Sequence, residues 1–148
     1  MEQSRTIQSF ALDSETAHTI LNGALDAHIL MSPAGMIVGW NPQSERIFGW
    51  TAEEVLGRRL SEVIIPPAYR EAHERGIQMF RATERGAVLG KRVETEGWHC
   101  DEYEFSIELT VTSAKTQGGH VFSAFVRDIT GRKRAEQSLK EAKERAEQ

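Results

Sequence analysis

The chain has 148 residues, with 18 lysines and arginines against 22 aspartates and glutamates, so its formal net charge is −4 at pH 7. This length fits a single domain, and the acidic balance argues against nucleic-acid binding as the main role. The one cysteine, Cys100, excludes an intrachain disulfide. We expect no secretory signal and no membrane span, and we expect a cytoplasmic location, because every apolar run in the sequence is short.

The N-terminal part predicts a flexible lead-in followed by a helix. Residues 1–13 are polar and lack any periodicity. Ser14 is placed to cap an amphipathic helix over residues 14–25, in which aliphatic and small residues recur at helical spacing. The apolar stripe is narrow, so we expect this helix to pack on a sheet edge or on a second copy of the chain.

A hairpin and two short helices are predicted next. Two apolar runs, 28–31 and 36–40, flank a Pro- and Gly-containing turn, as in a β-hairpin. Asn41 and Pro42 then suit the cap and first position of a helix that ends at Gly49. A capping-box pattern over residues 51–54 predicts a second helix that ends at Gly57.

Pro66 and Pro67 open the longest internal helix, which we expect over about residues 67–84. Its inward face carries residues at helical spacing, while Glu74 and other charged residues occupy the opposite face. His73 therefore points inward, where it is either a core histidine bonded to a backbone carbonyl or a ligand to haem iron. The inward residues are Tyr69, Ala72, His73, Gly76, Ile77 and Phe80.

The last third predicts three strands and a terminal helix. The strands are 88–97, 103–111 with unbroken alternation, and 121–129, which gives five strands in total. After them, Ala135, Leu139, Ala142 and Ala146 form the seam of a two-stranded coil over residues 131–148. We expect this segment to be the start of a longer coil that joins two copies of the chain in a homodimer.

Motifs for catalysis are missing from the sequence. It holds no phosphate-binding loop and no nucleophile elbow, so we expect no enzymatic activity from this segment. His99, Cys100, Asp101 and His120 carry metal-ligating groups, yet they lack the paired spacing of a structural zinc site. We interpret residues 99–101 as a polar turn between strands.

Two motif groups resemble a known family. Residues 37–42, with Phe48-Gly49-Trp50 and residues 54–57, resemble the first half of a PAS sensor domain. Residues 125–130, followed by Arg132-Lys133, resemble the "DIT" close of such domains and the start of their signalling helix. The resemblance covers about residues 14–148. It implies an α+β PAS fold over residues 26–130, with a five-stranded antiparallel sheet in the order 2-1-5-4-3 and helices on one face.

The resemblance also implies a function. Such a module senses a small ligand or the state of a cofactor and passes the signal through the coiled coil to an output domain. We expect a histidine kinase of a two-component system as the parent protein, with a diguanylate cyclase as the alternative. Asp128, Ile129 and Thr130 form the junction where the signal would pass to the coil.

The identity of the ligand follows from a narrower resemblance. Residues 69–73 resemble the haem-binding helix of rhizobial oxygen-sensor kinases, which places haem b on His73. In the same register Lys91 replaces an arginine that contacts oxygen, and Ile107 and Leu109 fall on apolar distal positions. The candidate pocket lining is completed by Ile77, Met79, Phe80, Leu89, Phe122 and Phe125.

Two alternatives stay open. Light-oxygen-voltage flavin domains carry a reactive cysteine before the long helix, but residues 57–63 contain none, which leaves only a non-covalent flavin. The other alternative is a PAS domain without a ligand that serves dimerisation or protein interaction alone. Cys100 also replaces the glycine of the usual Asp-Gly turn in the family, so we expect a longer or strained hairpin there.

Overall fold

The computed structural model describes residues 13, 15–17, 20, 25–83, 89–117 and 119–147. Its strands form one antiparallel sheet in the order β2-β1-β5-β4-β3, which confirms the predicted topology. The strands are β1 (Ala27–Met31), β2 (Ile37–Trp40), β3 (Arg92–Trp98), β4 (Glu104–Thr116) and β5 (Gly119–Asp128).

Side chains at the start of the helical segment confirm the predicted caps. Helix α3 (Pro42–Phe48) begins where the Asn41 side chain accepts a hydrogen bond from the Ser44 amide. It ends at Gly49, whose φ of 85° lies in the left-handed region that favours glycine. Helix α4 (Ala52–Val55) has a complete capping box between Thr51 and Glu54.

The long helix is also present, and one short helix was not predicted. A 3-10 turn (Pro67–Tyr69) leads into α6 (Arg70–Thr83), close to the expected range. Helix α5 (Leu60–Ile64) has no side-chain cap, so its sequence carries no start signal.

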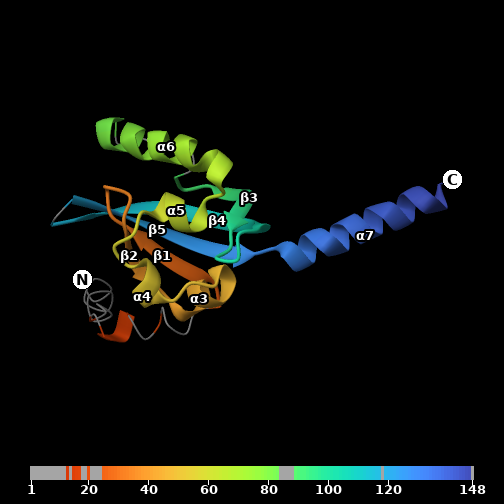
Figure 1. Cartoon of the computed structure of the whole chain (residues 1–148), viewed down its shortest axis with the longest axis horizontal. Helices are drawn as coiled ribbons and strands as arrows, with labels where there is room; N and C mark the ends of the chain where they lie inside the picture. Colours follow the sequence, from red (N-terminus) through yellow and green to blue (C-terminus); the bar gives the residue numbers. More distant parts are fainter. Residues whose placement is uncertain are drawn as a thin grey trace, which may run out of the picture.

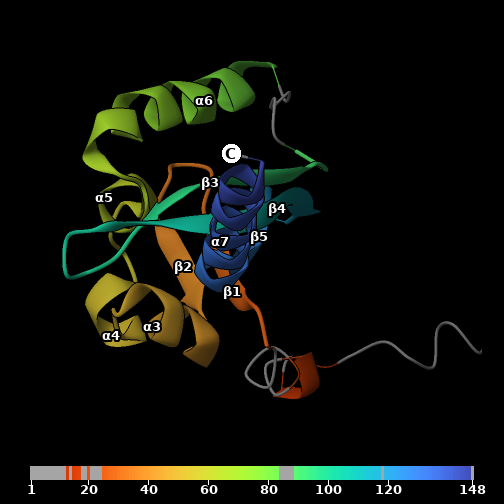
Figure 2. The ribbon, with the colours of Figure 1, turned by 90° about the vertical axis from the view of Figure 1, so that its right-hand side faces the viewer.

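Helices and sheet enclose a single apolar core on one face of the sheet. Figures 1 and 2 show α6 at one end of the helical layer and α3 and α4 at the other, with α5 between them. Phe48 and Val55 from the helices and Ala27, Ile29 and Ile107 from the strands are all at most 2% exposed in this core. The opposite sheet face carries the exposed side chains of Val38 and Phe125.

Helix α7 (Thr130–Ala146) leaves the sheet at the end of β5 and projects away from the domain (Figure 1). None of its described side chains is buried, and Leu139 of the predicted seam is 72% exposed in the single chain. Within the described residues, no helix is long and apolar enough to cross a membrane.

Three residues of the 3-10 turn and α6 lie differently from the prediction: Tyr69 and Met79, expected to face inward, and Glu74, expected to face solvent. Tyr69 is 53% exposed and lies in the 3-10 turn before α6, and Met79 is 62% exposed because it lies outside the buried stripe of α6 that Ile77 and Phe80 form. Glu74 is not solvated as predicted: its carboxylate accepts a hydrogen bond from Ser61 Oγ and lies 3.2 Å from Arg59 Nη1, which ties α6 to α5.

The predicted N-terminal helix falls mostly outside the described residues, as do Ser14 and the lead-in over residues 1–12. Within the described part, Asp13 accepts a hydrogen bond from the Thr16 amide at 2.7 Å. This cap bond comes from Asp13, and Ser14, which was the predicted cap, lies outside the described residues.

Candidate functional site

An apolar cavity of about 290 Å³ lies between α6 and the sheet. Helix α6 supplies one wall because residues 72, 73, 76, 77 and 80 recur at helical spacing and face the same way. The alternate residues of β1, β4 and β5 form the floor, and α5 closes one side. The lining residues are Ile29, Met31, Leu60, Ile64, Ala72, His73, Gly76, Ile77, Phe80, Leu89, Val111, Phe122 and Ala124.

Among the described residues that line this cavity, His73 is the one titratable side chain. Its Nδ1 atom is buried and has no hydrogen-bond partner among the described residues. Burial lowers the pKa of the imidazole below its ordinary value of 6.5, although the neighbouring Glu74 charge partly opposes this. The ring is therefore neutral at pH 7. An unpaired buried nitrogen costs free energy, so the placement of His73 is not explained by stability alone.

Gly76 leaves open space on the cavity side of α6. A Cβ placed on Gly76 would meet no atom within 4 Å. Glycine inside a helix costs about 0.5–1 kcal/mol relative to alanine, and here no packing contact explains that cost. The missing side chain instead widens the space beside His73.

The structure brings together some of the predicted site residues. Five of them line the cavity: His73, Ile77, Phe80, Leu89 and Phe122. Ile107 is 2% exposed and packs in the core beside Gly97 and Phe48, and Leu109 is half-buried, so neither belongs to the cavity wall. Lys91 is exposed and outside the cavity.

Phe125 is placed on the other face of the sheet, which corrects its assignment to the lining. It is 44% exposed, and its ring centroid lies 4.6 Å from that of His28. The reason is the alternation of side chains in a strand: Phe122 faces the helices, so a residue three positions later faces away. The same alternation identifies Ala124 as a wall residue, which the sequence reasoning missed.

The contacts at the tip of the β3–β4 hairpin support the interpretation of residues 99–101 as a polar turn between strands. Ligand atoms of His99, Cys100 and Asp101 lie within 4.8 Å of one another. However, His99 Nδ1 accepts the backbone N–H of Asp101 at 3.0 Å, and the ring stacks on Tyr103 with centroids 4.5 Å apart. Burial raises the pKa of the Cys100 thiol, which opposes the thiolate form that binds metals.

The strained position of this turn is Glu102, not Cys100. Glu102 has a φ of 62°, which lies in the left-handed region that favours glycine. The hairpin is therefore strained, as the sequence predicted, and the strained backbone lies at Glu102.

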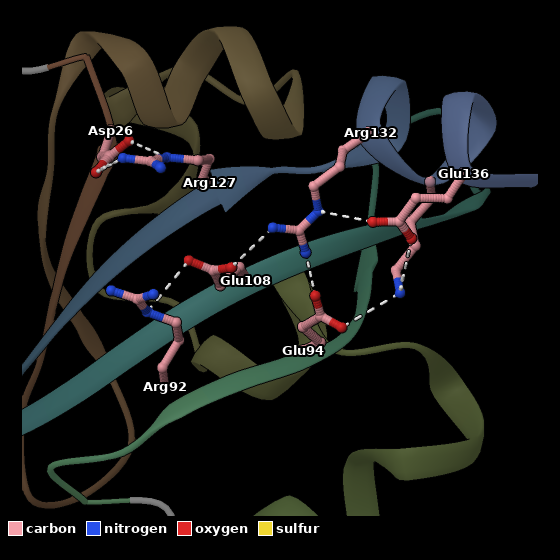
Figure 3. Close-up of polar contacts among 8 residues, drawn as sticks. Asp26, Arg92, Glu94, Glu108, Arg127, Arg132 and Glu136 are labelled. Atoms are coloured by element: carbon pink, nitrogen blue, oxygen red, sulfur yellow. Dashed lines mark hydrogen bonds and ion pairs between the residues drawn. The ribbon is translucent and has the colours of Figure 1, made fainter. Parts of the chain in front are cut away.

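The junction between β5 and α7 is held by hydrogen bonds and one buried side chain. Asp128 Oδ1 accepts from the Thr130 amide at 2.9 Å and from its hydroxyl at 2.6 Å. Ile129 is 4% exposed, and its amide donates to the carbonyl of Ser106 at 3.0 Å. Next to this junction, basic residues of α7 face acidic residues of β3 and β4 (Figure 3).

Comparison of the sequence with known proteins gives one matching family model and several relatives. A family model described as the PAS fold matches residues 16–129. An uncharacterized protein of Azorhizobium caulinodans is 41% identical over 122 residues, covering 82% of this chain and 17% of that protein. Sensor protein FixL of Bradyrhizobium diazoefficiens is 28% identical over 133 residues, covering 88% of this chain and 26% of that protein.

A third relative is also a signalling protein, and two solved structures share the fold. The cell-division control histidine kinase PdhS of Brucella anthropi is 30% identical and covers 95% of this chain. This chain spans 13% of PdhS and 26% of FixL. The PAS domain of an HTR-like protein from Haloarcula marismortui has a TM-score of 0.61 at 21% identity, covering 86% of this chain and 98% of that one. A PAS domain from Colwellia psychrerythraea reaches 0.65 at 19% identity, covering 79% and 97%.

Proposed function

The chain belongs to the PAS family, and from this premise we propose that it binds a small, mainly apolar molecule beside His73 and signals through α7. The observation that carries the proposal is the cavity between α6 and the sheet, whose described lining is apolar except for His73. A ligand with one polar group would pair with the His73 imidazole and bury its apolar part against the sheet. The PAS domain itself senses and does not catalyse.

The output domain is proposed from the relatives. Two of them carry the names sensor protein and histidine kinase, and both are several times longer than the segment that this chain matches. We propose that the parent protein is a histidine kinase. Helix α7 would then lead to the kinase, and its seam residues Ala135, Leu139, Ala142 and Ala146 would pair with a second copy.

His73 suits haem b as a ligand to the iron, but the cavity is too small for the porphyrin. His73 lines the cavity, and its lowered pKa keeps the imidazole neutral, as an axial ligand must be. The cavity volume of about 290 Å³ lies at the lower end of the range for pockets that enclose drug-sized molecules. A porphyrin needs more room, so it would enter only if α6 moved away from the sheet. We therefore propose a ligand smaller than haem.

A flavin fits the lining less well. Its ring system presents several polar atoms, whereas the described part of the cavity wall offers one polar side chain, His73. Burying the other polar atoms without partners would cost free energy for each of them. The chemistry of the wall instead suits a short aliphatic chain with one carboxylate or hydroxyl group.

Native mass spectrometry and titration test the proposal. We expect the purified protein to carry a small molecule or to bind added octanoate, with an affinity at least about tenfold lower in His73→Ala, the effect of one lost hydrogen bond. Gly76→Leu should abolish binding by filling the cavity. The control is Gln78→Ala, an exposed position on the same helix that should bind as the wild type does.

Two other outcomes would redirect the assignment. A Soret band after adding haemin, lost in His73→Ala, would overturn the size argument and identify haem as the ligand. If haemin, riboflavin monophosphate and octanoate all fail to bind, and nothing co-purifies, the ligand-free dimerisation domain replaces the proposal.

A further inference from the structure

Two glutamates of the sheet lie directly opposite each other beside the start of α7. Glu94 of β3 pairs with Glu108 of β4 in the strand register. Like charges at directly opposed positions destabilise a strand pair. The Glu108 side chain is only 15% exposed, so solvent screens its charge poorly. This pair therefore needs positive charge from elsewhere in the molecule.

Arg132 of α7 supplies that charge to both glutamates (Figure 3). Its Nη1 lies 3.3 Å from Glu108 Oε2, and its Nη2 contacts Glu94 Oε1. Its Nε lies 3.7 Å from Glu136 on the next turn of the helix. One guanidinium thus joins β3, β4 and α7.

Two further cations complete this group. Lys133 Nζ lies 3.2 Å from Glu94 Oε2, and Arg92 Nε lies 3.5 Å from Glu108 Oε1. We call the whole set the junction cluster: Arg92, Glu94, Glu108, Arg132, Lys133 and Glu136. Of these cations Arg132 alone contacts both opposed glutamates.

Apolar packing does not fix the orientation of α7. None of its described side chains is buried, and Ile129, the last buried residue before it, anchors only the point where the helix begins. A helix held at one point is free to rotate about its axis. The junction cluster supplies the contacts, away from that point, that oppose such rotation.

The cluster and the coiled-coil seam lie on neighbouring faces of α7. At 3.6 residues per turn, Arg132 and Glu136 are roughly a quarter of a turn from the line through Ala135, Leu139 and Ala142. Turning the helix to present a different seam would pull Arg132 away from Glu94 and Glu108. The direction in which the seam faces is therefore linked to these ion pairs.

We propose that Arg132 is a positioning residue that sets the rotation of α7 about its own axis by binding the opposed pair Glu94 and Glu108. This inference rests on the proposed role of α7 as the signal-carrying helix. The side chains of Arg132, Lys133 and Glu94 are 45%, 43% and 46% exposed, so the ion pairs to Glu94 are worth about 0–1 kcal/mol each and weaken with salt, and the cluster holds one orientation without locking it. A change in the sheet that alters the distance between β3 and β4 would release the helix.

Distances between two spin labels on one chain test this proposal. The labels are placed at Lys115→Cys on the sheet and Ser138→Cys on α7, both exposed, in a Cys100→Ser background. Excess unlabelled protein removes distances between copies. We expect one narrow distance distribution at low salt, and its loss at about 1 M salt, where the screening length falls to about 3 Å.

Substitutions separate Arg132 from its neighbours. Arg132→Gln should lose the narrow distribution even at low salt, while Arg132→Lys, which keeps the charge but not the forked geometry, should give an intermediate width. The matched control is Arg134→Gln, because Arg134 forms no ion pair within the described residues. Circular dichroism verifies that each variant keeps its fold.

The proposal is overturned if Arg132→Gln keeps the narrow distribution, or if Arg134→Gln loses it equally. No ligand is needed for this measurement. A failure to find a ligand for the cavity would thus leave the result on Arg132 standing, and a failure here would leave ligand binding beside His73 untouched.

Discussion

The two ends of the helical layer differ in how completely they are packed. At the packed end, formed by α3 and α4 on β1 and β2, Phe48, Val55, Ala27 and Ile37 are all fully buried. At the open end, formed by α6 over the cavity, only Ile77 and Phe80 of the described α6 side chains are buried. The packed end stabilises the fold, and the open end keeps the space that the proposed ligand would occupy.

The largest expected change in stability comes from replacing a phenylalanine at each end of the helical layer. Phe48→Ala should reduce the free energy of unfolding by about 3–5 kcal/mol, because Phe48 is fully enclosed between Trp40 and Phe105. Phe80→Ala should cost at least about 1 kcal/mol less, since Phe80 borders a cavity and α6 can relax toward the sheet. Urea unfolding followed by circular dichroism measures both. Equal losses would show that the open end is as tightly packed as the other.

A polar test at the packed end comes next in size. The Asn41 side chain accepts from the amides of His28 and Ser44, each at 2.9 Å, and donates to the carbonyl of Asp26 at 3.1 Å. Asn41→Ala should cost about 2–3 kcal/mol, because it leaves two buried amides without this acceptor. The control is Thr51→Ala at the exposed cap of α4, with an expected cost of about 1 kcal/mol. Equal losses of unfolding free energy in Asn41→Ala and Thr51→Ala would show that burial of the amides bonded to Asn41 does not raise the cost of losing their acceptor.

The smallest effect is a pH dependence at the open end. Because burial lowers the pKa of His73, the unfolded chain takes up a proton near pH 6.5 while the folded chain does not. The part of the stability that depends on neutral His73 is therefore fully present above pH 6.5, and it is lost as the pH falls from 6.5 through the lowered pKa. His73→Gln should reduce this loss, measured as urea midpoints at about pH 7.5 and about pH 5.5.

His28 at the packed end provides the comparison. Burial also lowers the pKa of this imidazole. The double variant His28→Gln and His73→Gln should therefore lose more of the pH dependence than either single variant. An unchanged dependence in His73→Gln would mean that the open end admits enough water to solvate a charged His73.

Local signals in the sequence predicted most of the fold. Asn41-Pro42 and Thr51 with Glu54 act through hydrogen bonds to residues three positions away, so a short stretch contains the whole signal. Helix α5 has no such local signal, because its stability comes from burying Leu60 and Ile64 and not from a cap. The sequence therefore did not predict it. Its contribution to the cavity wall was missed with it.

The site was predicted where a helical face defines it and missed where distant segments meet. The spacing of His73, Ile77 and Phe80 placed these residues in one wall. Arg132 gave no such signal, because its partners Glu94 and Glu108 are 38 and 24 positions away and come together only through strand pairing. Phe125 was misassigned because an apolar residue on the outer face of a sheet resembles a core residue in sequence.

The two edges of the sheet affect how copies of the chain can associate. The outer edge of β2 is occupied by the chain itself, since the Ile37 amide donates to the carbonyl of Arg58 and the Gly57 amide donates to the carbonyl of Ile37. The other edge, β3, carries Arg92, Glu94 and Glu96, and charged side chains along an edge oppose the addition of another strand. Neither edge therefore favours growth of the sheet from chain to chain, which protects this domain from edge-to-edge aggregation.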